Sequence, residues 1–215
     1  MKILSHRGYW KTESEKNSLV AFERSFQLGF GTETDFRDFN GRLVVSHDVP
    51  TYDGDWIYAE DFFECYKSFS SKMPLALNIK SDGIQRLLGE MLLKYKIENY
   101  FVFDMSIPDT LGYLKLGLNV FTRQSEFEPN PAFIDEVKGV WLDEFNSHWI
   151  SIDLISKYLK LGKKICIVSP DLHKREYQKE WETYKTVEMN SNDELENFWL
   201  CTDYPEKAKS FFYEN

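Results

Sequence analysis

The sequence is poor in cysteine and has no long hydrophobic run. Its three cysteines, Cys65, Cys166 and Cys201, are odd in number and far apart. This argues against a disulfide framework or a zinc site and predicts reduced thiols in a cytoplasmic protein. No apolar run is long enough to span a bilayer, and the first residues pass directly into polar ones. We therefore expect neither a membrane segment nor a signal peptide.

Basic residues are also in deficit. The chain has 26 Lys and Arg against 35 Asp and Glu, which gives a formal net charge of -9. Phosphate backbones need a basic surface, so this balance excludes nucleic acid as an expected partner. It still allows a small phosphate ligand in a local pocket. A chain of 215 residues with 42% hydrophobic residues can bury a core, and we expect one domain over residues 1–215. The sequence does not indicate an oligomeric state.

The stretch Thr32–Asp48 combines two carboxylates with a tight turn. Glu33 and Asp35 are one residue apart in a run of strand composition, so both side chains point to one face of the strand. Asn40-Gly41 predicts a type I′ turn, because both residues tolerate positive φ. The return strand, Arg42 to Ser46, then leads to a histidine.

That histidine, His47, and the following Asp48 return beside the acidic pair. Two hard oxygen donors near an imidazole predict a divalent-metal site with an acid/base group attached. An ideal two-residue hairpin, however, places His47 opposite Thr34 rather than opposite either carboxylate. His47 reaches the metal face only if the strand ends or bulges there.

Strand-like and helix-like segments alternate along the rest of the chain. We expect strands at 2–5, 75–80, 100–103, 118–122, 139–142, 164–168 and 198–201, besides those of the hairpin. Helices are expected between them: from a cap at Asn17 to Gly29, at 59–66, at 84–95, from Pro108 to Gly117, from Ser151 to Gly162, at 172–183 and from Pro205. This alternation predicts a parallel sheet and, with about eight strands, an α/β fold of the (β/α)8 TIM-barrel type.

In such a barrel the active site lies at the carboxyl ends of the strands. Polar residues stand there in this sequence: His6, Arg7, Asn78, Lys80, Asp104, Arg123, Asp143, Glu144, Ser169 and Asp203. Most of them simply mark loops, but the pair at 6–7 and the lysine at 80 directly continue hydrophobic strands. The two remaining histidines, His148 and His173, are expected at the surface.

The spaced motifs resemble the glycerophosphodiester phosphodiesterase family of phospholipase C-like phosphodiesterase TIM barrels. The resemblance rests on His6-Arg7-Gly8, Asn17 to Phe22, Glu33-Thr34-Asp35, Val44 to Asp48, Leu77 to Lys80 and Thr202 to Pro205. It implies a magnesium or calcium ion and hydrolysis of a small-molecule glycerol-linked phosphodiester, a reaction of lipid metabolism. In this family a neighbouring substrate hydroxyl is thought to attack first, and water then opens the cyclic phosphate.

Chemistry and resemblance together suggest a role for each matched residue. Glu33, Asp35 and Asn78 are the expected metal ligands, as oxygen donors. Arg7 and Lys80 are expected to bind phosphate, and His6 and His47 to share the acid and base duties.

Two positions depart from the family's pattern. Lys16 stands where the family usually has a glutamate that could neutralise the arginine of the His-Arg-Gly motif. Asn78 stands where the third metal ligand is usually glutamate, and an amide oxygen contributes no charge. Another carboxylate could compensate, and Asp104, Asp143 and Glu144 are candidates by position.

Two alternatives stay open from the sequence. One is a phospholipase C- or D-like activity on lipid diesters, although the acidic balance argues against stable membrane association. The other is a barrel that binds a phosphorylated ligand without cleaving it, which the departures at 16 and 78 would explain.

Overall fold

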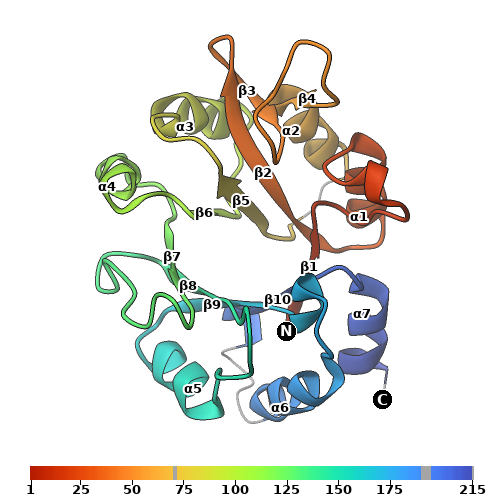
Figure 1. Cartoon of the computed structure of the whole chain (residues 1–215), viewed down its shortest axis with the longest axis vertical. Coiled ribbons are helices and arrows are strands. Elements are labelled where there is room, and N and C mark those ends of the chain that lie inside the picture. Colours follow the sequence, from red (N-terminus) through yellow and green to blue (C-terminus); the bar gives the residue numbers. More distant parts are fainter. Residues whose placement is uncertain (70–71, 190–194, 215) are drawn as a thin grey trace. The chain divides into compact units, whose positions relative to one another are not determined.

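The computed structural model describes residues 1–69, 72–189 and 195–214. The described chain forms two compact units, each built of strands that alternate with helices (Figure 1). One unit joins Met1–Leu4 to Phe121–Asn215, and the other is Ser5–Val120. The boundary falls inside strand β1 (Lys2–His6), so its end at His6 belongs to the second of these units. The expectation of one domain over residues 1–215 stays a prediction.

The unit Ser5–Val120 contains a mixed sheet. Its strands are β2 (Gly31–Phe39), β3 (Arg42–Val45), β4 (Ile57–Tyr58), β5 (Leu75–Ile79) and β6 (Tyr100–Phe103). β5 pairs in parallel with β2 and β6, whereas β3 pairs antiparallel with β2 and β4. The helices of this unit are α1 (Leu19–Gln27), α2 (Ala59–Ser68), α3 (Gln85–Lys94) and α4 (Ile107–Lys115), and a short 3-10 turn, η1, covers Glu13–Glu15.

The β2–β3 hairpin forms as its turn sequence predicts. Asn40 and Gly41 have φ values of 50° and 74°, as a type I′ turn requires. Phe36 of β2 pairs with Val45 in the antiparallel register and packs against the aromatic ring of Phe62 from α2. These three side chains are fully buried, so the hairpin is anchored in the core of its unit.

Helix α1 begins one residue later than the sequence analysis expected. Ser18, not Asn17, is the N-cap, and its hydroxyl accepts a hydrogen bond from the Ala21 amide. Asn17 instead adopts a left-handed conformation with φ 58°, which frees its side chain for contacts outside the helix. The prediction of Asn17 as the cap was therefore wrong, because its side chain forms hydrogen bonds with Thr34 and Asp35 instead.

The other unit contains a parallel sheet with the strand order β10-β9-β8-β7. These strands are β7 (Phe121–Gln124), β8 (Gly139–Leu142), β9 (Lys164–Val168) and β10 (Phe198–Thr202). β7 starts later than predicted, so Arg123 lies inside the strand. The helices are α5 (Ile152–Lys160), α6 (Gln178–Met189) and α7 (Pro205–Tyr213), with short 3-10 turns η2 (Pro170–His173) and η3 (Leu195–Asn197).

The predicted helix at 172–183 was wrong in its first half. η2 ends at His173. The next residue, Lys174, adopts a left-handed conformation with φ 57°, and α6 begins only at Gln178. A left-handed residue interrupts a right-handed helix, so two separate elements replace one. Among the described residues, no helix combines the length and hydrophobicity that crossing a bilayer requires.

Candidate active site

Two carboxylates and one amide lie side by side in the unit Ser5–Val120. Glu33 and Asp35 alternate on β2 and therefore share a face, and the parallel register places Asp35 beside Asn78 of β5. All three are buried, with exposed fractions of 2%, 0% and 7%. Burial of two carboxylates is costly unless cations or donors surround them. The neighbours of each acid therefore show what the site can hold.

Asp35 is surrounded by positive charge. Its Oδ2 lies 3.0 Å from Nε of Arg7, and its Oδ1 lies 3.5 Å from Nζ of Lys80. The side-chain amide of Asn17 donates a hydrogen bond of 2.8 Å to the same Oδ2. Thr34 in turn donates to the carbonyl oxygen of the Asn17 side chain, which fixes the amide's orientation. Asp35 thus places two cations at the ends of β1 and β5.

Glu33 has weaker compensation. The Arg7 backbone amide donates to its Oε2 at 3.2 Å, and Nε2 of His6 lies 3.9 Å from the same oxygen. Burial, followed by repulsion from Asp35, raises the pKa of Glu33 from 4.5 to about 7. Without a further cation, this carboxylate is therefore poorly stabilised in its ionised form.

Several backbone angles at this site are unusual. Arg7, Asn17 and Asp104 have φ values of 56°, 58° and 69°, in the left-handed region that non-glycine residues seldom occupy. Gly8 follows with φ 79°, and a Cβ at this position would lie 2.7 Å from the Cβ of Ala21. Strained conformations of this kind concentrate at functional sites, where the surrounding structure holds them.

The donor set fits a hard divalent cation. Oδ1 of Asp35 and Oδ1 of Asn78 are buried, and neither makes a hydrogen bond. Buried oxygens that lack hydrogen bonds are costly, so a ligand at this place would recover the lost free energy. Carboxylate and amide oxygens are the ligands that magnesium and calcium prefer. Glu33 would supply a third donor, and its raised pKa marks a need for positive charge.

His47 lies just beyond the end of β3. The strand ends at Val45. The Ser46 amide still donates to the backbone carbonyl of Asp35, so His47 is the first residue after the last backbone bond to β2. The imidazole is 45% exposed, and its Nδ1 lies 2.8 Å from Oδ1 of Asp48. Arg37 donates through Nε to the His47 carbonyl and fixes the backbone there.

A cavity of about 410 Å³ is lined by Arg7, Asn17 and the residues that follow β3, but not by the three oxygen donors, Lys80 or His6. Arg7 and His47 both line it, so the residue that contacts Asp35 and the histidine of the hairpin share one cavity. Lys16 also lines it, but its charge is balanced, because Nζ lies 2.6 Å from Glu13 and 4.4 Å from the centre of the Trp10 ring. The cavity has the size of a small-molecule site.

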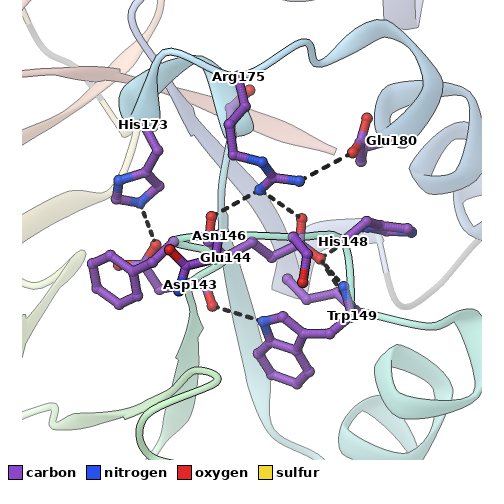
Figure 2. Close-up of polar contacts among 12 residues, drawn as sticks. Asp143, Glu144, Asn146, His148, Trp149, His173, Arg175 and Glu180 are labelled. Carbon is purple, nitrogen blue, oxygen red and sulfur yellow. Dashed lines mark hydrogen bonds and ion pairs between the residues drawn. The ribbon is translucent and has the colours of Figure 1, made fainter.

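The other unit contains a second cluster of acids and histidines, drawn in Figure 2. Ligand atoms of Glu144, His148 and Glu180 lie within 4.8 Å of one another. Arg175, however, lies 3.8 Å from Glu144 and 3.4 Å from Glu180. Oε1 of Glu144 also accepts hydrogen bonds from the amides of residues 149 and 150. One guanidinium thus already contacts both acids, and it competes with a metal ion for this cluster together with the backbone amides.

Both His148 and His173 contact acids, but the expectation of a surface position is confirmed only for His148, which is exposed, and is wrong for His173, which is half-buried. Nε2 of His173 lies 2.7 Å from Oδ1 of Asp143, and Nδ1 of His148 lies 2.9 Å from Glu144 (Figure 2). His173 is only 23% exposed.

No family model and no curated protein sequence matches the chain. Solved structures, in contrast, do match this chain. A glycerophosphodiester phosphodiesterase from Parabacteroides distasonis is 19% identical, with a TM-score of 0.71, over 99% of this chain and 97% of that one. A phosphodiesterase from Oleispira antarctica, solved in complex with the product sn-glycerol-3-phosphate, is 13% identical, with a TM-score of 0.65, over 98% and 96%.

The fold is a (β/α)8 barrel. Barrels of other function match at lower scores. The tryptophan synthase α-subunit of Pyrococcus furiosus is 12% identical, with a TM-score of 0.58, over 100% of this chain and 98% of that one. At these identities the likeness shows the fold alone, and the function has to be argued from the residues of the site.

The structure brings Glu33, Asp35, Asn78, Arg7 and Lys80 together and adds Asn17 to them, while the roles predicted for these residues stay predictions. Asn17 was assigned to a helix cap, whereas its side chain holds Asp35. The signal was present, because Asn17 begins one of the matched motifs. The arrangement also agrees with the barrel fold, since Arg7, Lys80 and Asp104 directly follow β1, β5 and β6.

Proposed function

We propose that this protein hydrolyses a glycerophosphodiester, or a related polyol-phosphate diester, with the help of a magnesium or calcium ion. One observation carries the proposal. Glu33, Asp35 and Asn78 gather buried oxygen donors, two of which make no hydrogen bond, directly beside Arg7 and Lys80. Cleavage of a phosphodiester requires the charge on its phosphoryl oxygens to be neutralised, and a cation site beside fixed positive charge would do this. The fold shared with glycerophosphodiester phosphodiesterases supports the same reaction.

Charge neutralisation falls to the two basic residues. Arg7 is 21% exposed and lines the cavity, so its guanidinium can bind two phosphoryl oxygens at once. Lys80 is 22% exposed and adds a point charge from the end of β5. A bound divalent ion would polarise the phosphoryl oxygen as a Lewis acid. Asp35 serves both functions, because it contacts the two basic side chains and its Oδ1, which makes no hydrogen bond, can bind the cation.

Proton transfer falls to His6 and His47. Nε2 of His6 lies near Glu33, which would stabilise the imidazolium form after it has taken a proton from the attacking hydroxyl. His47 is exposed to the cavity and bonded to Asp48, so it can deliver a proton to the leaving alcohol. A neighbouring hydroxyl of the glycerol is the expected nucleophile, and water then opens the cyclic phosphate.

A lipid diester is the second candidate substrate. The loop that lines the cavity exposes two apolar side chains, with Val49 at 74% and Tyr52 at 85% exposure. Such a rim could insert into a lipid surface, although the net charge of -9 opposes docking on anionic lipids. Co-sedimentation with liposomes decides between the two. Binding that Tyr52→Ser abolishes would favour the lipid substrate.

Steady-state hydrolysis tests the main proposal. The protein is assayed on glycerophosphocholine and glycerophosphoglycerol with magnesium, with calcium and with a chelator. We expect turnover that needs the metal and falls at least about 100-fold in His6→Gln and in His47→Gln. His148→Gln is the matched control, because it removes a histidine outside the site and should retain turnover. Absence of turnover on both diesters from a folded protein would exclude the hydrolase and leave a barrel that only binds a phosphorylated ligand.

A further inference from the structure

The oxygen donors of the candidate site fit a divalent ion, but its two carboxylates alone cannot balance the charge of that ion together with those of Arg7 and Lys80. The two carboxylates of Glu33 and Asp35 are already matched in number by the cations of Arg7 and Lys80, and both cations contact Asp35. Asn78, the third oxygen donor, is neutral. A divalent ion added to this set would therefore meet repulsion from Lys80.

Asp104 is placed to relieve that repulsion. The parallel β5–β6 register pairs Asn78 with Phe103, so Asp104 lies level with Ile79, the residue before Lys80. Nζ of Lys80 lies 3.5 Å from Oδ1 of Asp35 and 4.0 Å from Oδ2 of Asp104, so the ammonium group stands between two carboxylates. Asp104 also has a φ of 69°, one of the left-handed conformations at this site.

The other two acids that could compensate for Asn78 already have partners elsewhere. Asp143 lies 2.7 Å from His173, and Glu144 lies 3.8 Å from Arg175. Asp104 belongs to the same unit as the other residues of the candidate site.

We propose that Asp104 is a positioning residue that acts as the counter-ion of Lys80. By balancing the ammonium group, Asp104 leaves Oδ1 of Asp35 available to a cation, and it replaces the negative charge that Asn78 lacks. This inference rests on the proposed function of the site. Asp104 would then raise the affinity for the cation by balancing the charge of Lys80, and not by binding the cation itself.

A double-mutant cycle measured by calorimetric titration with magnesium chloride and calcium chloride tests this assignment. Asp104→Asn removes the charge but keeps the size, and asparagine tolerates the left-handed conformation equally well. We expect this substitution to weaken cation binding about tenfold, the scale found for residues that support metal ligands. In a Lys80→Met background the same substitution should change the affinity less than about twofold, because the charge to be balanced is gone.

Asp38→Asn is the matched control, because it removes an exposed carboxylate from β2 outside the cluster. It should leave the affinity unchanged. Equal weakening by Asp104→Asn in both backgrounds, or no weakening in either, would overturn the role assigned to Asp104. A wild-type protein that binds neither cation would overturn the inference and the metal-dependent reaction together. A protein that binds the ion but hydrolyses no diester would contradict the proposed function alone.

Discussion

Glu33→Gln should make the protein more stable at alkaline pH, although it removes a residue of the candidate site. Glu33 is 2% exposed, and burial and Asp35 raise its pKa from 4.5 to about 7. One pKa unit corresponds to about 1.4 kcal/mol, so ionising Glu33 in the folded protein costs about 3 kcal/mol. Glutamine keeps an acceptor for the Arg7 amide without this cost.

The sign follows from linkage. Below about pH 4.5 Glu33 is protonated in the folded and the unfolded chain, so the wild type pays no penalty there. Between about pH 4.5 and 7 the unfolded chain ionises first, and the wild type loses stability as the pH rises. Above about pH 7 the full difference in stability between the variant and the wild type is present. Glu33→Gln should therefore gain about 3 kcal/mol at pH 8 and close to nothing at pH 4.5.

Urea denaturation in the presence of a chelator, followed by tryptophan fluorescence at both pH values, measures this difference. For a domain of this size the gain at pH 8 corresponds to roughly 6–12 °C in melting temperature. Glu13→Gln, at a side chain 79% exposed, is the control and should change stability little at either pH. A variant no more stable than the wild type at pH 8, or equally stabilised at both pH values, would refute the assignment of Glu33 as a strained acid.

Three further substitutions, with Gly29→Ala as the control for the first, probe the site and its support. Gly8→Ala should cost about 1–3 kcal/mol by denaturation, because its Cβ would lie 2.7 Å from that of Ala21, whereas Gly29→Ala, with φ 78° and open space, should cost about 1 kcal/mol. Asn17→Ala should lower kcat/KM about tenfold and leave the fold intact, and full activity would show that its bond to Asp35 is dispensable. Glu144→Gln should cost about 3–5 kcal/mol of stability without changing cation affinity, and an altered affinity would contradict its structural role.

Local sequence signals predicted most of the elements. Asn40-Gly41 determined the hairpin, because positive φ at two adjacent residues leaves few other turns. The period-two spacing of Glu33 and Asp35 predicted a shared face, and parallel pairing of β2 with β5 placed Asp35 beside Asn78. The turn and the shared face follow from neighbours in sequence or along one strand, whereas the pairing of β2 with β5 follows from the predicted parallel sheet.

The features that were missed depend on distant contacts. Asn17 had the local character of a cap, but Asp35 and Thr34 hold its side chain. His173 was expected at the surface, yet it bonds to Asp143, an acid thirty residues away that directly follows β8. His47 lies beyond the strand end as required, but the direction of its ring depends on Asp48. No pattern within a single segment encodes these choices.

Phosphorus NMR of a glycerophosphodiester incubated with the purified protein tests the central claim most directly. With magnesium or calcium present, the diester signal should be replaced by that of a glycerol phosphate monoester, and a chelator should stop the change. If the diester stays intact with either ion while the protein remains folded, Glu33, Asp35 and Asn78 do not form the metal site of a phosphodiesterase.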